Sequence, residues 1–447
     1  MVKSDAAKPR ILVIGASGLI GNFIAIDLAR RGYPVVAVAR SLERSQAFSL
    51  SESTVLEIAI VEMDTAALAR LLDEQATDVI VNCIGALQDR AATSTSDVHE
   101  AFVGRLIAAI RSLDRPMLLA HLGVPGREEE DRTEFSLTKR RGEHLIRDAG
   151  IQAAILRPGF VVAPAAYGGS ALLRGLAALP VDLSPEDLGR PFAAVAVEDV
   201  AETVAFLIEH WAPGDRSCNV SFDLMHPELL TLRHVIDLFR HWLGQTGGRR
   251  LVLPKFLLDL GARAGDLAGR LGWAPPVCTT ALAELRRGVA GDPDLWIRTT
   301  GIEPRPIGRV LLEHPATVQD KWFARLYLLK PLVIAVLTAF WCLSGLIALT
   351  VAYGAAVEIL TSRGFSAGLA QAITAASSIL DIAVGIAIAV RRTCRTGLLA
   401  GIAVSVFYMV GAAAMTPDLW FEPLGALVKT GPAILLMMVA LAVLDNR

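Results

Sequence analysis

The sequence contains few residues of the kinds that form disulfides or bind metal ions. Its 447 residues include only five cysteines, which lie far apart and form no Cys-x-x-Cys pair. The eight histidines form no His-Glu-x-x-His pattern, so we expect reduced cysteines and no metal site. An excess of charge is also missing, because 43 Lys and Arg stand against 45 Asp and Glu. This balance argues against a nucleic-acid partner.

Two further absences divide the chain. No signal peptide is expected, because residues 1–9 are polar and lead directly into an apolar strand. Charged residues almost vanish in the last third, where four apolar runs cover 331–353, 364–390, 396–415 and 423–444. Each run has about 20 residues or more, enough to cross a hydrocarbon core of about 30 Å. We therefore predict an all-α bundle of four transmembrane helices.

Charged residues beside these runs predict their orientation. The connection between the third and fourth runs carries the acidic Asp418 and Glu422. The basic residues that precede the first run, or separate the second from the third, are Lys321, Arg325, Lys330, Arg391, Arg392 and Arg395. Because Lys and Arg are enriched in cytoplasmic loops, we expect a multi-pass protein of the cell (inner) membrane with its N-terminal domain and C-terminus in the cytoplasm.

One acidic residue interrupts the second apolar run. Ser377, Asp381 and Gly385 recur every four residues, so they share a helix face that we expect to point into the bundle. A charge there costs roughly 2.5–3.5 kcal/mol on insertion scales, and it needs a partner or a function. Lys429 is the obvious cation, but its predicted depth matches Glu358, near the outer end of the first helix, better than Asp381.

A glycine-rich stretch near the start has the pattern of a phosphate-binding corner. Residues 11–14 predict a buried strand, and Gly15, Gly18 and Gly21 follow at the spacing G-x-x-G-x-x-G before a predicted helix over 22–31. Such glycines allow a tight turn, the approach of the backbone to a pyrophosphate, and close packing of helix on strand. The helix N-terminus directs free N–H groups at the phosphates.

The end of the second predicted strand, 34–39, indicates which dinucleotide binds. Arg40 stands where an Asp or Glu would accept the ribose 2′-OH of NAD, and an Arg suits the 2′-phosphate of NADP. We therefore expect NADP(H) as the cofactor, with NAD(H) as the less favoured choice. The expected cofactor-binding residues in this part of the chain are Gly15, Ser17, Gly18, Leu19, Ile20, Arg40, Asp64, Cys83 and Gly85.

Strand and helix patterns alternate over the first half of the chain. The predicted elements after residue 40 are strands at 55–61, 78–85, 117–121 and 151–156 and helices at 66–75, 98–113 and 135–149. Strands that alternate with helices of this length predict an α/β fold, a doubly wound parallel sheet of the Rossmann type.

A smaller, mainly helical lobe is predicted between the sheet and the membrane runs. It contains a helix over 200–210, for which Asp199 is the expected N-cap. The amphipathic stretch 253–271 is expected to pack against this lobe, although its pattern also suits a membrane surface. The predicted domains are thus an NAD(P)-binding domain (1–173), a substrate lobe (174–320) and a four-span membrane domain (321–447).

Short motifs in both halves resemble known families. With the glycine loop, residues 10–215 resemble extended and atypical short-chain dehydrogenases/reductases, especially the branch similar to the 39-kDa accessory subunit of respiratory complex I. The motifs are Asn82-Cys-Ile-Gly85, Leu156-Arg-Pro-Gly159, Tyr167-Gly-Gly169 and Val197-Glu-Asp-Val-Ala201. Residues 321–447 resemble the DoxX-like membrane family through Trp341-x-x-Ser-Gly345, Leu380-Asp-x-x-x-Gly385 and Leu419-Trp-Phe-Glu-Pro-Leu-Gly425, followed by Lys429.

The resemblance to the reductases also implies a catalytic pattern that this chain keeps only in part. Members use a Tyr-x-x-x-Lys pair and an upstream Ser, and the matching segment here is Phe135-Ser-Leu-Thr-Lys139, with Gly123 at the expected place of the Ser. Lys139 is thus the implied ribose contact and catalytic lysine. Tyr167, on the expected substrate loop, is the other catalytic candidate, whereas His121 is more simply a satisfied buried histidine.

Two functions remain open at this stage. The first is a membrane-tethered oxidoreductase that binds NADP(H) and acts on a lipid-like or quinone-like substrate without the usual tyrosine. Its partners are the dinucleotide and a membrane lipid or apolar substrate. The second is a nucleotide-binding subunit or sensor without turnover, which stabilises a membrane assembly together with a membrane protein partner.

Overall fold

The chain folds into two compact units. Its computed structural model describes residues 8–89, 94–211, 218–245, 247–415, 417, 420 and 427–444. The first unit spans residues 1–264 and 276–324, and the second spans 265–275 and 325–447. Asp418 and Glu422, on which the predicted orientation partly depends, lie outside the described residues.

A parallel sheet of seven strands forms the centre of the first unit. Its strand order is β10-β6-β5-β4-β1-β2-β3, and every pair of neighbours is parallel. The strands are β1 (Ile11–Ile14), β2 (Val35–Ala39), β3 (Thr54–Glu57), β4 (Val79–Asn82), β5 (Leu118–Leu122), β6 (Gln152–Pro158) and β10 (Asn219–Leu224). Strands β2 and β3 lie on one side of β1, and the later strands β4, β5, β6 and β10 lie on the other side. In sheets of this kind ligands bind beyond the carboxyl ends of the strands where the order switches, which here is between β1 and β4.

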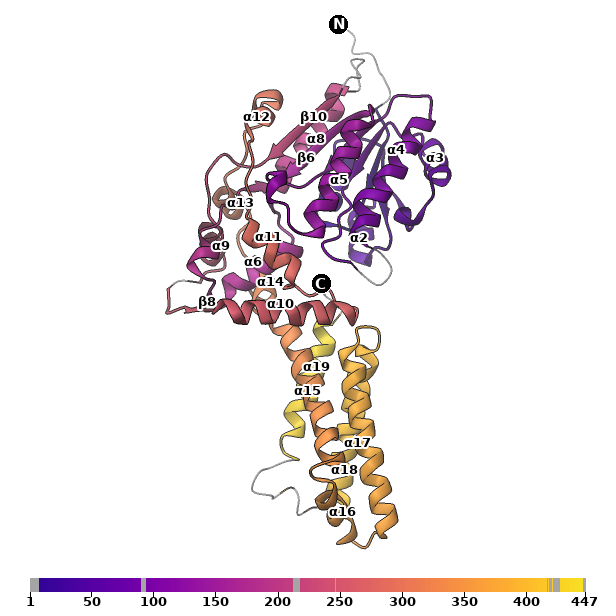
Figure 1. The fold of residues 1–447 in the computed structure, drawn as a ribbon, viewed down its shortest axis with the longest axis vertical. Coiled ribbons are helices and arrows are strands. Elements are labelled where there is room, and N and C mark those ends of the chain that lie inside the picture. Colours follow the sequence, from indigo (N-terminus) through magenta and orange to yellow (C-terminus); the bar gives the residue numbers. More distant parts are fainter. Residues whose placement is uncertain are drawn as a thin grey trace. The chain divides into compact units, whose positions relative to one another are not determined.

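Helices cover both faces of the sheet because its central strands are apolar on both sides. In β1, Ile11 and Val13 pack in the cluster with α1 and α8, whereas Leu12 and Ile14 pack in the cluster with α3, α4 and α5. The helices are α1 (Leu19–Arg30), α2 (Arg44–Ser49), α3 (Thr65–Glu74), α4 (Phe102–Ser112), α5 (Glu134–Asp148) and α8 (Val197–Trp211). Helices α3, α4 and α5 lie side by side in Figure 1. The predicted doubly wound α/β fold is confirmed.

The lobe contains two small parallel sheets and a group of helices, which belong to the first unit except for residues 265–270 and 325–327 at the ends of two helices. The sheets pair β7 (Phe160–Val162) with β9 (Ala194–Ala196) and β8 (Val181–Asp182) with β11 (Leu251–Val252). The helices are α6 (Gly168–Ala178), α7 (Pro185–Leu188), α9 (Leu232–Trp242), α10 (Lys255–Arg270), α11 (Thr279–Arg287), α12 (Asp294–Thr300), α13 (Ile307–Glu313) and α14 (Val318–Tyr327).

One expectation for this region is wrong, and another holds only in part. Asp199 does not cap a helix, because α8 already begins at Val197 and the Asp199 carboxylate accepts a hydrogen bond from the Arg305 amide, 2.9 Å away. The amphipathic stretch forms α10, which contacts the lobe through Ala262 and Asp259 and leaves its large apolar side chains exposed. Phe256, Leu260 and Leu267 are 67%, 60% and 58% exposed.

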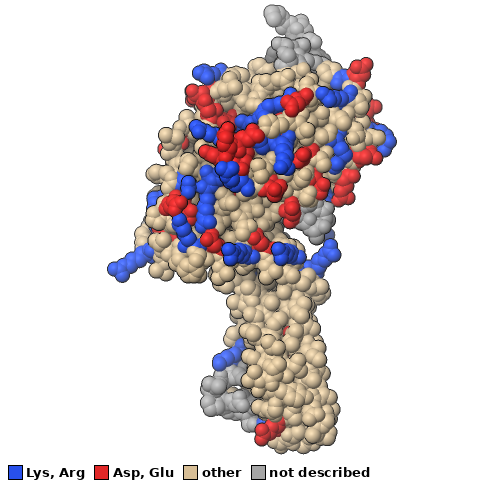
Figure 2. Space-filling model, viewed as in Figure 1, with Lys and Arg blue, Asp and Glu red and all other residues tan. Residues whose placement is uncertain are grey.

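The second unit consists mainly of apolar helices. Three of the described helices, α15 (Leu329–Leu349), α17 (Ala367–Ala389) and α18 (Cys394–Met415), are long and apolar enough to cross a membrane. The others are α16 (Tyr353–Thr361) and the apolar α19 (Thr430–Val443), which has 14 residues. Figure 2 shows almost no charged side chain over the visible face of these helices. A helical membrane bundle is therefore confirmed, with a fourth apolar helix shorter than predicted.

Small residues bring α15 and α17 into close contact. A Cβ atom on Gly385 would lie 2.9 Å from the backbone nitrogen of Cys342, so a larger residue would separate the helices. Asp381 is buried, and its carboxylate accepts a hydrogen bond from the Tyr408 hydroxyl of α18, at 3.0 Å. Glu358 lies in the separate helix α16 rather than in the first span. The hydrogen-bond partner of Asp381 is thus the phenol of Tyr408 and not the cation that the sequence led us to expect.

Candidate functional site

The turn between β1 and α1 leaves backbone N–H groups free at a helix end. Gly15 has a φ of +88°, and its amide and that of Ala16 both donate to the Val38 carbonyl, at 2.9 and 3.0 Å. Gly18 is the N-cap of α1 and makes no side-chain cap hydrogen bond. Among the described residues, no side-chain hydrogen bond caps the first amides of α1, those of Leu19 and Ile20. This is the arrangement that a pyrophosphate fits.

The glycine turn packs against the end of β4, the neighbouring strand. A Cβ atom on Gly15 would lie 3.1 Å from the Cys83 carbonyl carbon, and one on Gly21 would overlap the Gly15 carbonyl oxygen. Burial raises the pKa of the Cys83 thiol to about 12, so the side chain stays neutral. The sequence-predicted residues Gly15, Gly18 and Cys83 are thus brought together.

Three other predicted cofactor residues lie around this corner with different roles. The Ser17 carbonyl accepts a hydrogen bond from the Gln46 amide nitrogen of α2, at 2.9 Å, which joins α2 to the glycine turn. Arg40 follows β2 directly and is exposed. Asp64 caps α3, because its carboxylate accepts from the Ala67 amide at 2.7 Å. This carboxylate therefore has a structural role of its own.

Lys139 lies under the ends of β4 and β5. Its side chain is 5% exposed, and Nζ donates to the carbonyl oxygens of Ile84 and Leu122, at 3.0 and 2.7 Å. A Cβ atom on Gly85 would lie 3.8 Å from Nζ, so the lysine contacts the loop after β4 as well. Burial lowers the pKa of Lys139 to about 8, against the opposing effect of Glu143. The ammonium form has three donors, and two of them are used.

Two buried histidines surround Lys139, and only one of them was considered from the sequence. His99 accepts from the Ala86 amide through Nε2, at 3.0 Å, and its Nδ1 lies 2.9 Å from the Thr138 hydroxyl. Because that hydroxyl donates to the Glu134 carbonyl at 2.6 Å, Nδ1 carries the proton. Burial, with a smaller effect of the Lys139 charge, lowers the pKa of His99 to about 2.

His121 is the second of these histidines. Its Nδ1 lies 3.1 Å from the Asn82 amide nitrogen, and its Nε2 has no hydrogen-bond partner among the described residues. Burial first, and then Lys139 and His99, hold the pKa of His121 well below its usual value. Both histidines are therefore neutral at physiological pH, and neither can donate a proton as an imidazolium.

The two other positions of the reductase pattern are filled by packing. Phe135 packs edge to face on His99, with ring centroids 5.6 Å apart. A Cβ atom on Gly123 would overlap a carboxylate oxygen of Glu143, which is buried and accepts hydrogen bonds from Arg140 and Arg157. A serine cannot occupy position 123 unless this ionic cluster moves. The Tyr and Ser of the reductase pattern are thus absent. Phe135 fills the first position, and Glu143 occupies the space beside Gly123 at the second.

Tyr167 lies at the start of α6 and is 42% exposed. Its backbone amide and carbonyl both pair with the Ser170 hydroxyl, at 3.0 and 2.9 Å. Within the described ranges no hydrogen bond or ring contact joins Tyr167 to Lys139 or His121. The two catalytic candidates, Tyr167 and Lys139, are thus not directly bonded to each other in the described structure.

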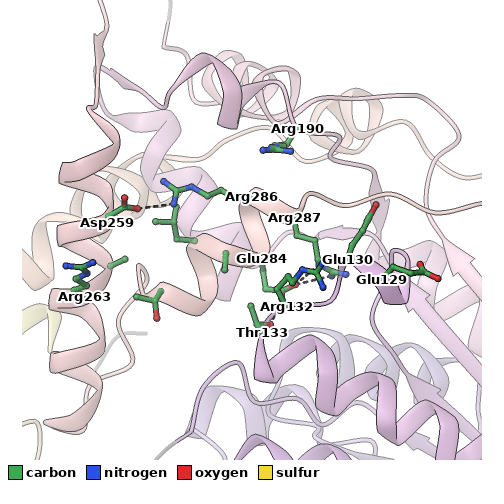
Figure 3. A pocket seen from close by; sticks show the side chains of 14 residues that line it. Glu129, Glu130, Arg132, Thr133, Arg190, Asp259, Arg263, Glu284, Arg286 and Arg287 are labelled. Atoms are coloured by element: carbon green, nitrogen blue, oxygen red, sulfur yellow. Dashed lines mark hydrogen bonds and ion pairs between the residues drawn. The ribbon is translucent and has the colours of Figure 1, made fainter.

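A cavity of about 660 Å³ lies beside the start of α5. Figure 3 shows Asp259 and Arg263 reaching it from α10, and Arg286 and Arg287 from α11. Arg286 pairs with Asp259 at 2.9 Å, and Arg287 with Glu284 at 3.0 Å. The lining residues are Glu129, Glu130, Arg132, Thr133, Arg190, Asp259, Ala262, Arg263, Thr279, Leu282, Ala283, Glu284, Arg286 and Arg287. No sequence motif signals this cavity, because its walls come from four separate segments.

Comparison with known proteins identifies two regions. Residues 11–220 match the NAD dependent epimerase/dehydratase family, and residues 338–438 match the DoxX-like family. The mitochondrial NADH-ubiquinone oxidoreductase 40 kDa subunit of Neurospora crassa is 24% identical over 296 residues, which cover 66% of this chain and 76% of the subunit. A probable low-salt glycan biosynthesis reductase of Haloferax volcanii is 27% identical over 164 residues, 33% of this chain and 52% of the reductase.

Solved structures share the fold at low sequence identity. UDP-glucuronic acid 4-epimerase from Bacillus cereus, solved with UDP-glucuronic acid and NAD, aligns with a TM-score of 0.51 at 14% identity, over 71% of this chain and 100% of the epimerase. The enzyme WbmG from Bordetella bronchiseptica, solved with NAD, aligns with a TM-score of 0.53 at 13% identity, over 72% and 97%. The chain thus joins an epimerase-like Rossmann domain of the short-chain dehydrogenase/reductase type, similar to the complex I subunit, to a C-terminal DoxX-like domain.

Proposed function

We propose that this chain is a membrane-tethered oxidoreductase that binds NADP(H) and reduces an apolar, quinone-like or lipid-like substrate. One observation carries this proposal: the glycine turn and the buried Lys139 are present, whereas Phe135 and Gly123 stand at the positions of the usual Tyr and Ser. A substrate that needs no proton from the protein fits such a site. The DoxX-like domain on the same chain supports a substrate that partitions into the membrane.

Each residue of the site has a definable task in this proposal. The amides of Leu19 and Ile20 would bind the pyrophosphate, and Arg40 would pair with a 2′-phosphate at the end of β2. Lys139 holds the ends of β4 and β5 together with two ammonium protons and keeps the third for a ribose hydroxyl. Tyr167, exposed at the start of α6, would contact the substrate.

The chemistry balances without a catalytic acid from the protein. When bound, a reduced nicotinamide supplies a hydride, and the second hydrogen that a quinone needs to become a quinol arrives as a proton from water. His99 and His121 are neutral and Phe135 is apolar, so none of the three adds a charge beside Lys139. An environment with little free water protects a hydride donor from side reactions.

The proposed activity is tested by NADPH oxidation. The full-length protein in lipid nanodiscs should oxidise NADPH with a short-chain quinone and leave a simple ketone unreduced. Lys139→Met should weaken NADPH binding about 10- to 100-fold, because a charge-assisted hydrogen bond contributes about 1.5–3 kcal/mol. The absence of quinone-dependent oxidation across a panel of quinones and enals, despite tight NADPH binding, would contradict the proposed reductase.

The choice of NADP(H) depends on Arg40. We expect the unaltered protein to bind NADPH about 10- to 100-fold more tightly than NADH, because one charge-assisted contact to the 2′-phosphate contributes about 1.5–3 kcal/mol. Arg40→Asp should erase or reverse this preference, and Arg44→Asp, in the nearby helix α2, should leave it intact. Nicotinamide fluorescence titration measures both affinities. Equal affinities in the unaltered protein would exclude the role given to Arg40.

We also propose that the first unit and the C-terminus lie in the cytoplasm, where NADPH is available. The basic residues Arg391, Arg392 and Arg395 between α17 and α18 support this orientation. In a variant without native cysteines, an impermeant thiol reagent added to intact cells should label Asp418→Cys and leave Thr393→Cys unlabelled. The reverse labelling would invert the topology.

A nucleotide-binding subunit without turnover is the second candidate. It is favoured by the complex I relative, which is named as a subunit of an assembly, and by Lys139, which already bridges two strands through their carbonyls. In this function bound NADP(H) would stabilise the fold and a membrane protein partner would read its presence. Tight NADPH binding without turnover, together with a membrane protein that co-purifies stoichiometrically, would favour this candidate.

A further inference from the structure

Helix α10, which begins in the first compact unit and ends in the second, carries an apolar row of side chains that are largely exposed. Phe256, Leu257, Leu260 and Leu267 are 67%, 44%, 60% and 58% exposed. At 100° per residue these side chains fall within about one third of the helix circumference. Exposed apolar side chains scattered singly are normal in proteins, but a row of four along one helix marks an interaction surface.

The opposite face of α10 is already occupied. Asp259 and Ala262 line the cavity, and the Asp259 carboxylate pairs with Arg286 of α11 at 2.9 Å (Figure 3). Ala262 is 1% exposed. The orientation of α10 about its own axis is therefore fixed by contacts on the cavity side, and the apolar row is held outward.

The end of α10 is fixed to a membrane-spanning helix. Residues 265–275 belong to the compact unit of the membrane helices. The indole nitrogen of Trp273 donates to the carbonyl of Ala389, the last residue of α17, at 2.7 Å, and the Arg391 amide donates to the Leu271 carbonyl at 3.0 Å. The guanidinium of Arg391 also lies over the indole ring of Trp273, 5.5 Å from its centre.

These contacts set the depth of the helix end. A helix of 23 residues such as α17 is about 35 Å long, so its last residue lies at the boundary of the hydrocarbon core rather than inside it. Trp and Arg are the residues typical of that boundary. Leu267 and Leu271 precede Trp273 by less than two helical turns and therefore lie at the same boundary.

We propose that α10 is an interfacial membrane helix whose row Phe256, Leu257, Leu260 and Leu267 enters the surface of the lipid bilayer. We expect these side chains to contact lipid. The lipid belongs to the leaflet on the side of the membrane where α17 and α18 are connected. The basic residues Arg270 at the end of α10 and Arg391 and Arg392 in that connection suit anionic headgroups. The proposal does not depend on the oxidoreductase function.

Lipid cross-linking of the unaltered protein tests this surface. The full-length chain is placed at one copy per nanodisc with phosphatidylcholine that carries a diazirine in its acyl chain, irradiated and analysed by peptide mass spectrometry. Adducts are expected on Phe256, Leu260 and Leu267 at a level comparable to Phe407, which is 72% exposed on α18. Phe48, 83% exposed on the short helix α2, should carry none.

A spin-label pair provides a second measurement. With the native cysteines replaced, labels at Leu267→Cys and Gly269→Cys differ by about 160° around the helix axis. The label at 267 should be at least threefold more accessible to oxygen, relative to a water-soluble nickel chelate, than the label at 269. Equal ratios at both positions, or the absence of lipid adducts on α10 when Phe407 is labelled, would each overturn the proposal.

Discussion

Phe135→Tyr is expected to raise the NADPH-dependent reduction of a reactive carbonyl by about 10²- to 10⁴-fold, the usual contribution of a positioned general acid. The reason is geometric. Position 135 lies one helical turn before Lys139, so a phenol there would lie on the same face of α5 as the ammonium group. The charge of Lys139 would lower the pKa of the phenol and so make it a better proton donor. The phenol could then protonate the alkoxide that hydride transfer creates.

The matched control is Phe135→Leu, which keeps an apolar side chain against His99 and adds no hydroxyl. NADPH oxidation with a quinone and with a carbonyl compound is followed for all three proteins, together with NADPH affinity. Leu should leave carbonyl reduction at its low starting level. If Tyr binds NADPH normally and still reduces no carbonyl, the site does not hold a substrate near the nicotinamide, and the function without turnover gains support.

The serine of the pattern cannot be restored in the same way. Gly123 packs against the Glu143 carboxylate, which also accepts hydrogen bonds from Arg140, Arg147 and Arg157. Adding a side chain at 123 would separate a buried carboxylate from its partners, which destabilises a protein by about 3–5 kcal/mol. Any loss of activity in Gly123→Ser would therefore report on folding. For this reason only the substitution at position 135 can test whether the site supports carbonyl reduction.

The fold could be predicted because its signals are local. The apolar runs that became β1, β2, β4, β5 and β6 were found within a few residues of their observed ends, since a buried parallel strand is apolar on both faces. The glycine corner was found because its residues are adjacent in the sequence. Once the strand order is known, the right-handed connection between parallel strands determines which face of the sheet each helix covers.

The environment of the site could not be predicted, because its contacts join distant segments. His99 and Lys139 are separated by 40 residues, and nothing in the sequence near His99 shows that Thr138 and Ala86 take both of its ring nitrogens. Asp381 of α17 was expected to need a cation, yet its partner is the hydroxyl of Tyr408 on the neighbouring helix α18. The exposed face of α10 was assigned to the lobe because an amphipathic pattern does not say what covers it.

Gly21→Ala is expected to weaken NADPH binding by about 10²-fold or more. Its Cβ would overlap the Gly15 carbonyl oxygen and lie 2.9 Å from the Gly15 carbonyl carbon. Both are backbone atoms that no rotamer change can move, so α1 must shift away from the turn. The amides of Leu19 and Ile20 would then leave the pyrophosphate, and two charge-assisted hydrogen bonds contribute roughly 1.5–3 kcal/mol each.

Gly104→Ala is the matched control, because Gly104 also lies in a helix, α4, but a Cβ there meets no atom within 4 Å. This substitution should stabilise the fold by up to about 1 kcal/mol, since alanine has the higher helix propensity, and should leave NADPH affinity unchanged. Fluorescence titration and thermal melting of both variants separate the two effects. A Gly21→Ala protein that melts near the unaltered temperature and binds NADPH fully would refute the glycine turn as the phosphate site, because close packing of α1 on that turn is the physical basis of the assignment.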